Sequence, residues 1–159
     1  MSETAHFADR LLEAIEKKKN PSVVGLDPQL DGIPSHLKNA GEAVFRNSVS
    51  GAARVFERYF LELLDHIHEV APAVKPNKAF WEAYGPDGVV AYRRIVDYAK
   101  SLGLVVITDS KRNDIGSTAE AYADGLIGEV KLFEGSTPVD DVDATTVNAY
   151  LGSERIQGS

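Results

Sequence analysis

Four short and almost continuous apolar runs constrain the fold of this chain more than any other feature of the sequence. We predict them as β-strands at residues 22–26, 70–74, 104–108 and 144–147. The segments before and between them carry apolar residues at the three- and four-residue spacing of amphipathic helices. The resulting order, αβαβαβαβ, predicts an α/β fold in which crossover helices connect the strands of a parallel sheet. The lack of polar alternation within the runs agrees, because such strands are covered on both faces.

Local signals predict several boundaries of these elements. The first helix should end at the lysines 17–19, since cations stabilise the C-terminal end of a helix. Gly-Pro-Asp-Gly at 85–88 predicts a turn before a further helix, and Ser-Thr-Ala-Glu at 117–120 fits a capping box that would open another. A linker rich in glycine, aspartate and proline should precede the fourth strand. Pro72 weakens the second strand, because proline fits poorly in a central strand.

Each predicted strand ends in charged or amide side chains. They are Asp27, Lys75, Asp109 with Lys111, and Asn148. In (β/α)8 barrels and in open α/β sheets, active sites lie at the carboxyl ends of the strands. The polar strand ends therefore predict a functional site at this edge of the sheet.

The segment from Asp109 to Asp114, Asp-Ser-Lys-Arg-Asn-Asp, holds the densest group of charges at a strand end. Residues two apart in a strand point to the same side, so Asp109 and Lys111 should project together, with Asp114 in the turn that follows. Placing such charges at the end of an apolar strand costs free energy unless they form ion pairs or take part in binding or catalysis. A solvated ion pair that contributes about 0–1 kcal/mol is the simpler alternative. The polar ends of the other strands favour a functional site.

Composition excludes several classes of protein. The net charge of -7 argues against a nucleic-acid-binding surface, which needs a concentrated basic face. Without cysteine, the chain cannot form disulfides, use a catalytic thiolate or build a cysteine-based zinc site. No apolar run approaches the ~18 residues of a membrane span, and the N-terminus shows no secretory signal pattern. We therefore expect a cytoplasmic protein that associates with neither membranes nor nucleic acid.

Other conspicuous residues have simpler interpretations. His66 and His68 lie two apart in a predicted helix and do not share a face, so we interpret them as surface or packing residues rather than metal ligands. Phe80 and Trp81 are predicted to pack rather than to form a base-stacking platform. The acidic stretch at 140–143 is interpreted as a solvated loop rather than a metal site.

Four motifs in chain order carry a resemblance to a known family. They are Gly-Leu-Asp-Pro at 25–28, Val-Lys-Pro-Asn-Lys-Ala-Phe at 74–80, Asp-Ser-Lys-Arg-Asn-Asp-Ile-Gly-Ser-Thr at 109–118, and Val-Asn-Ala-Tyr-Leu-Gly at 147–152. Together they resemble the orotidine 5′-phosphate decarboxylases of the longer bacterial type, over about residues 20 to 153. The Asp-x-Lys-x-x-Asp core alone is shared with sister enzymes that act on phosphate sugars.

The resemblance implies a (β/α)8 TIM barrel. Residues 1–159 would cover about the first four βα units, as the N-terminal half of a single barrel domain, since such barrels take about 250 residues. The C-terminal half, with its phosphate-binding residues, would be absent from this chain, so we expect the chain to be inactive alone. An open sheet of four or five strands is the alternative, because a half-barrel leaves strand edges unpaired.

The resemblance also implies a reaction and a role for each polar strand end. Orotidine 5′-monophosphate would lose carbon dioxide to give uridine 5′-monophosphate in de novo pyrimidine synthesis, without a cofactor. Lys111 would donate a proton to C6, Asp109 would lie against the substrate carboxylate, and Lys75 would hold Asp109 and contact the ribose. Asp27 would bind the ribose, and Asn148 is a further candidate for substrate binding.

A homodimer is implied as well. Asp114 would be the fourth catalytic charge, and Asp114, Ile115 and Thr118 would reach across the interface into the partner's site. Asn113 departs from the family, which has glycine there, although asparagine also tolerates a positive φ better than most residues.

Three alternative functions remain open. A phosphate-sugar decarboxylase or aldolase of the same superfamily would bind Mg²⁺ through these carboxylates. A Schiff-base aldolase would use Lys111 as nucleophile, although two flanking carboxylates keep a lysine charged rather than nucleophilic. The non-enzymatic alternative is an inactive half-barrel that only associates with partners.

Overall fold

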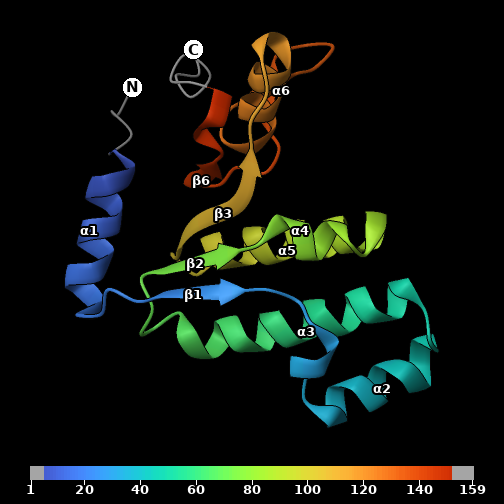
Figure 1. The fold of residues 1–159 in the computed structure, drawn as a ribbon. Helices are drawn as coiled ribbons and strands as arrows, with labels where there is room; N and C mark the ends of the chain where they lie inside the picture. Colours follow the sequence, from blue (N-terminus) through green and yellow to red (C-terminus); the bar gives the residue numbers. More distant parts are fainter. Residues whose placement is uncertain (1–5, 152–159) are drawn as a thin grey trace.

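The computed structural model describes residues 6–151. Within this range, four strands form a parallel sheet (Figure 1). The strands are β1 (Val23–Leu26), β2 (Ala73–Pro76), β3 (Val105–Arg112) and β6 (Ala144–Val147), in the spatial order β1-β2-β3-β6. Each strand pairs in parallel with the next one of the sheet. The predicted parallel sheet with crossover helices is therefore confirmed.

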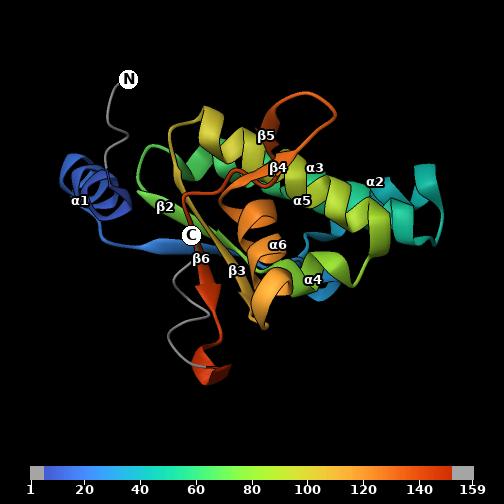
Figure 2. The same ribbon diagram turned by 90° about the horizontal axis from the view of Figure 1, so that it is seen from above.

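Helices connect the strands and cover the sheet. They are α1 (Phe7–Lys18), α2 (Ser35–Phe45), α3 (Val49–Ile67), α4 (Lys78–Glu82), α5 (Gly85–Ser101) and α6 (Gly116–Leu126), with short 3₁₀ helices at Leu30–Gly32 and Ala149–Leu151. Figure 2 shows α3 and α5 side by side on the same face of the sheet. No helix within residues 6–151 is long and apolar enough to cross a membrane.

A small hairpin occupies the predicted linker before β6. Its antiparallel strands are β4 (Glu129–Lys131) and β5 (Ser136–Pro138). Each strand has only three residues, and the hairpin exposes most of its side chains. Such short and polar strands give no periodic signal in the sequence, which explains why the hairpin was not predicted.

Aromatic side chains form the centre of the core between the sheet and the helices. Phe56, Trp81 and Tyr92 are at most 1% exposed, and the Phe56 and Trp81 rings pack edge to face with centroids 6.4 Å apart. The Trp81 indole N–H donates to the Leu26 carbonyl at 3.0 Å, which ties α4 to the end of β1. The prediction that Trp81 packs is confirmed, whereas Phe80 is exposed.

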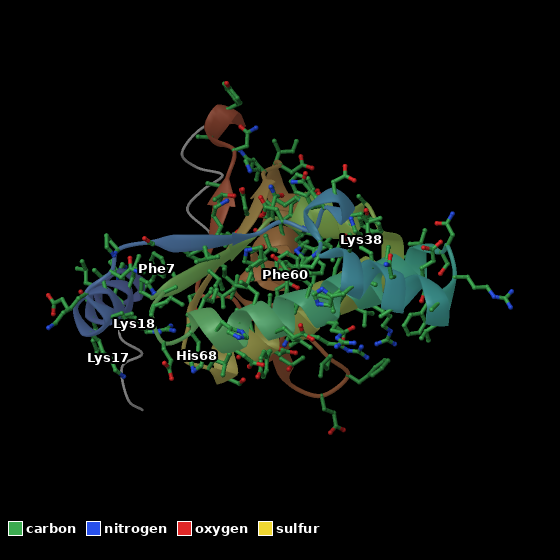
Figure 3. The ribbon with its side chains drawn as sticks, turned by 90° about the horizontal axis from the view of Figure 1, so that it is seen from below. Phe7, Lys17, Lys18, Lys38, Phe60 and His68 are labelled. Atoms are coloured by element: carbon green, nitrogen blue, oxygen red, sulfur yellow. The ribbon has the colours of Figure 1, made fainter. Side chains whose placement is uncertain are left out.

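The Lys18 side chain attaches the end of α1 to the rest of the fold. Helix α1 ends at Lys18, and Lys19 adopts a left-handed conformation as its C-cap, so the predicted end is confirmed. Lys18 Nζ donates to the carbonyl of His68, and Figure 3 labels both residues. It also donates, at 2.8 Å, to the Ala71 carbonyl beyond α3. The His68 carbonyl at the end of α3 has no intrahelical donor, and Lys18 provides one. His66 is exposed and His68 is half-buried, which agrees with surface or packing roles.

Strand β2 and helix α5 begin at other residues than predicted. The N–H groups of residues 70 and 71 donate to the Ile67 carbonyl and close α3, so β2 begins only at Ala73. Residues 85–88 are the first turn of α5 rather than a turn before it. Pro86 suits this position, because an N–H in the first helical turn would have no partner in the helix.

The end of β3 and the start of α6 also differ from the prediction. Strand β3 continues to Arg112, because pairing with β6 resumes there after a β-bulge. The capping box predicted at 117–120 is absent, since α6 begins at Gly116 and its N-cap, Ile115, makes no side-chain bond to the helix. Gly116 has a φ of 52°, a conformation that favours glycine and lets the chain turn from strand to helix.

The acidic stretch at 140–143 is not a solvated loop. Asp140 is 7% exposed and pairs with a lysine of α4. Asp143 accepts from Arg10 at 2.5 Å and from the Val106 N–H at 2.7 Å. These bonds attach the segment before β6 to α1, β3 and α4, so its carboxylates hold elements of the fold together.

Candidate active site

Neighbouring strands place one carboxylate between two lysines at the carboxyl end of the sheet. Asp109 and Lys111 lie on β3, and Lys75 lies on β2. Lys75 Nζ is 2.8 Å from Asp109 Oδ2, and Lys111 Nζ is 2.5 Å from Asp109 Oδ1. The predicted projection of Asp109 and Lys111 to the same side is therefore confirmed.

Asp109 is nearly buried, whereas its lysine partners are accessible. The residue is 7% exposed and accepts a third hydrogen bond, from Thr146 Oγ1 on β6, at 2.7 Å. Burial alone would raise the pKa of this carboxyl, but the bonds from Lys111, Lys75 and Thr146 outweigh burial and hold the pKa of Asp109 well below its ordinary value. The side chains of Lys75 and Lys111 are 36% and 63% exposed, so both ammonium groups can reach a ligand.

The backbone at Lys111 is strained and is held on both sides. Its φ is 49°, which is uncommon for a residue other than glycine, and it lies within the β-bulge. The Lys111 N–H donates to Thr146 Oγ1 at 3.2 Å. The next residue, Arg112, donates to the Glu82 carboxylate oxygens at 2.6 and 2.5 Å. These contacts stabilise a conformation that costs on the order of 1–3 kcal/mol.

Asp114, Ile115 and Thr118 lie beyond this cluster, in and after the turn into α6. The Asp114 carboxylate accepts from the Ile115 N–H at 2.8 Å. Within residues 6–151 it makes no ion pair with Lys75 or Lys111. Ile115 is 58% exposed, and Thr118 is also exposed. The structure thus brings together three of the four predicted catalytic charges and leaves Asp114 outside.

Asp27 and Asn148 follow the ends of β1 and β6. Asp27 Oδ1 is buried and has no hydrogen-bond partner among the described residues. Because a buried oxygen without a partner is costly, this atom is suited to accept a bond from a ligand hydroxyl. Asn148 is exposed, its carbonyl accepts from the Asn113 amide, and its Oδ1 accepts from the Tyr150 N–H at 3.0 Å. Asn113 therefore joins the loops after β3 and β6.

A second cluster lies on the opposite face of β3, against α5. The Tyr92 hydroxyl donates to Thr108 Oγ1 at 2.9 Å and lies 3.4 Å from Asp140 Oδ2. Asp140 pairs with Lys78, whose Nζ is 5.1 Å from the centre of the Tyr92 ring. Burial and the Asp140 carboxylate raise the pKa of Tyr92, so the phenol stays protonated.

Sequence reasoning missed Thr146 and this second cluster. Lys78 and Asp140 are 62 positions apart, and Asp109 and Thr146 are 37 positions apart. Thr146 is one of two neighbouring threonines in the strand and gives no signal of its own. Only the position of Thr146 two residues before Asn148, on the last predicted strand, could have indicated it.

The open cluster around Asp109 is suited to proton transfer to an anionic substrate. Two ammonium groups can attract a negatively charged ligand, and Lys111 carries a transferable proton at a fixed position. No group of three or more histidine, aspartate and glutamate side chains that could hold a metal ion occurs in residues 6–151.

Comparison with known proteins gives the same family over most of the chain. A family model described as "Orotidine 5'-phosphate decarboxylase / HUMPS family" matches residues 22–159. The chain is 38% identical over 151 residues to an orotidine 5′-phosphate decarboxylase from Rhodopirellula baltica, covering 95% of this chain and 48% of that protein. It is 32% identical over 152 residues to one from Caldicellulosiruptor bescii, covering 96% and 50%. The chain therefore spans about half the length of the curated relatives it matches.

Solved structures agree with this assignment. An orotidine 5′-monophosphate decarboxylase from Leishmania donovani matches with a TM-score of 0.66 and 28% identity, over 96% of this chain and 48% of that one. A uridine 5′-monophosphate synthase from the same organism matches with a TM-score of 0.70 and 28% identity, over 97% and 27%. The decarboxylase neighbours are TIM barrels of which this chain covers about half, so the predicted fold class is confirmed. Family match, sequence identity and fold together show that the chain belongs to the orotidine 5′-phosphate decarboxylase / HUMPS family.

Proposed function

We propose that the natural full-length protein converts orotidine 5′-monophosphate to uridine 5′-monophosphate in de novo pyrimidine synthesis. The observation that carries this proposal is the Asp109 carboxylate between Lys75 and Lys111 at the carboxyl end of the sheet, in a member of this family. The curated relatives are named for this decarboxylase activity. We further propose that residues 1–159 are the N-terminal half of a single barrel domain, because the chain spans about half of those relatives.

The reaction needs stabilisation of negative charge at C6 and then a proton. When the bond between C6 and its carboxylate breaks, carbon dioxide leaves and the electron pair stays on C6. The Lys111 ammonium stabilises this charge and transfers a proton to C6, which forms the C–H bond of the product. Lys111 is left as an amine and regains its proton from solvent. The reaction requires no electron acceptor, because the electron pair left on C6 forms the new C–H bond.

The other polar residues bind and orient the substrate in this proposal. Asp109 fixes the position of Lys111 and lies against the substrate carboxylate. Lys75 holds Asp109 and contacts the ribose. Asp27 accepts from a ribose hydroxyl through its Oδ1, which has no hydrogen-bond partner within residues 6–151. Asn148, at the end of β6, faces the substrate from the last of the four strands.

We propose a homodimer in which Asp114, Ile115 and Thr118 contribute to the partner's site. This assignment is supported by the position of the Asp114 carboxylate outside its own lysine cluster and by the exposure of Ile115 and Thr118. A cytoplasmic location stays a prediction of the sequence.

A turnover assay of the natural full-length protein tests the proposed reaction. Orotidine 5′-monophosphate should be converted to uridine 5′-monophosphate. The rate should be unchanged after the enzyme has been incubated with EDTA and dialysed. Turnover of a phosphate sugar instead, lost with EDTA and recovered with Mg²⁺, would identify the metal-dependent sister enzyme. Covalent trapping of substrate on Lys111 by borohydride would identify a Schiff-base aldolase. If the protein shows neither turnover nor saturable nucleotide binding, the remaining alternative is a protein without enzymatic activity that only associates with partners.

Complementation tests the shared site. Full-length Lys111→Ala and Asp114→Ala chains should each be inactive alone, and mixing them should restore part of the activity, because one of the two sites in a mixed dimer would combine intact residues. The mixed dimers are to be quantified by native mass spectrometry. If they form and no activity returns, Asp114 does not serve the partner's site.

A further inference from the structure

We infer that Thr146 is a positioning residue, whose hydroxyl holds the Asp109 carboxylate and the Lys111 backbone in the arrangement that the proton transfer requires. The inference deepens the proposed decarboxylation and rests on it. Thr146 lies on β6 and is half-buried, beside the bulged part of β3.

The Thr146 hydroxyl uses both of its hydrogen-bonding capacities within the site. It donates to Asp109 Oδ1 at 2.7 Å and accepts from the Lys111 N–H at 3.2 Å. The same oxygen, Asp109 Oδ1, receives the Lys111 ammonium at 2.5 Å. One hydroxyl therefore fixes both ends of the proton donor: the backbone from which the side chain starts and the carboxylate oxygen against which its ammonium lies.

The β-bulge explains why a side chain is needed at this place. Regular pairing between β3 and β6 is interrupted between Thr108 and Arg112, and Lys111 lies in the interrupted part with its positive φ. A backbone N–H in a regular strand would find a carbonyl on the neighbouring strand. Here the Thr146 hydroxyl replaces that acceptor, so its loss would leave both the Lys111 N–H and the Asp109 oxygen with one partner fewer.

Thr145 provides a matched control on the same strand. Its hydroxyl lies 2.7 Å from Ser110 Oγ, on the face of the sheet opposite to Asp109 and Lys111, because neighbouring residues of a strand point to opposite sides. Replacing either threonine by valine removes one hydroxyl and keeps the branched shape. Only the change at 146 removes contacts of the lysine–aspartate cluster.

The first experiment measures kcat and KM of the natural full-length enzyme per active site, with sites counted by titration with a tightly bound nucleotide inhibitor. Thr146→Val should lower kcat by roughly 10- to 100-fold, the effect of a misplaced catalytic group, with KM within about 3-fold of wild type. Thr146→Ser keeps the hydroxyl and should recover kcat to within about 3-fold, and Thr145→Val should stay in the same range. If Thr146→Ser is as slow as Thr146→Val, the methyl group rather than the hydroxyl matters, and the inference is wrong.

The second experiment has a readout apart from activity. Amide hydrogen exchange followed by NMR should show faster exchange of the Lys111 N–H in Thr146→Val, and unchanged exchange in Thr146→Ser and Thr145→Val. The ¹³C titration of the Asp109 carboxyl should show a higher pKa in Thr146→Val than in wild type, because a donor to the ionised form is lost. Wild-type values of kcat and of Lys111 exchange in Thr146→Val would overturn the inference. If the wild-type enzyme itself shows no turnover of orotidine 5′-monophosphate, the proposed function is wrong. The wild-type assay therefore separates failure of the proposed function from failure of the inference about Thr146.

Discussion

Two carboxylates on opposite faces of β3 are bound by similar groups but have different surroundings. Asp109 and Asp140 are each 7% exposed. Asp109 lies against two lysines and a threonine hydroxyl, and Asp140 lies against one lysine and a tyrosine hydroxyl. The lysine side chains at Asp109 are 36% and 63% exposed, whereas that of Lys78 at Asp140 is 16% exposed and lies against the Tyr92 ring. The first cluster opens at the carboxyl end of the sheet, and the second is closed beneath α5.

The difference teaches which of two similar clusters can act on a ligand. A closed ion pair has its charges satisfied within the fold, and removing one partner leaves the other buried and uncompensated. An open cluster keeps its ammonium groups within reach of a substrate. It contributes less to the free energy of unfolding, because exposed groups that lose their partner can be hydrated. We therefore expect changes at Asp140 to affect mainly folding and changes at Asp109 to affect mainly turnover.

The largest effect on stability is expected from Asp140→Asn in the natural full-length protein. The free energy of unfolding should fall by about 3 kcal/mol, because the Lys78 ammonium loses the counter-charge of a largely buried pair. Urea denaturation followed by circular dichroism measures this change. Arg58→Ala, which breaks an exposed pair with Glu62 on α3, is the control and should cost no more than about 0.5 kcal/mol. Equal losses in both variants would remove the distinction between closed and open pairs.

Asp109→Asn should separate turnover from stability. We expect the free energy of unfolding to fall by only about 1–2 kcal/mol, because both lysines are partly exposed. Turnover should fall on the order of 100-fold, because Lys111 loses the charge that holds its ammonium. Steady-state kinetics and urea denaturation on the same preparation give both numbers. A variant that unfolds readily and keeps its turnover would invert the comparison.

The pH dependence of stability should show a smaller effect with a definite sign. The pKa of Asp109 is lower in the folded protein than the ~3.9 of an unfolded chain, so its contribution is fully present above that value and is lost as the pH falls below it. The difference in unfolding free energy between wild type and Asp109→Asn should be constant from about pH 5 to 7 and shrink below about pH 4. A difference that grows on acidification would show that the folded pKa is raised instead.

The order of the elements could be predicted from the sequence, but several of their contacts could not. The strand at 104–108 could be predicted because a buried parallel strand is apolar along its length. The strand at 144–147 gives a weaker signal, because it is only half-buried and carries two threonines. The charges of Asp109 and Lys111 are visible as a pair because a two-residue spacing has a simple geometric meaning. The resemblance adds the roles of these residues, which spacing alone leaves open.

The contacts that could not be predicted depend on irregular backbone and on distant parts of the chain. The β-bulge and the positive φ of Lys111 follow from pairing with β6 and leave no pattern near residue 111. The pair of Lys78 and Asp140 joins segments 62 positions apart. The start of α6 depends on the conformation of Gly116, so a plausible capping box at 117–120 was misleading.

Replacement of Lys111 by alanine in the natural full-length enzyme tests the central claim most directly. If Lys111 is the proton donor of the open cluster, turnover of orotidine 5′-monophosphate should fall by roughly 10²- to 10⁴-fold or more. The variant should still bind uridine 5′-monophosphate, measured by calorimetry, because Lys75, Asp27 and the rest of the pocket remain. Turnover within tenfold of the wild-type rate, with binding intact, would contradict the assignment of Lys111 as the proton donor.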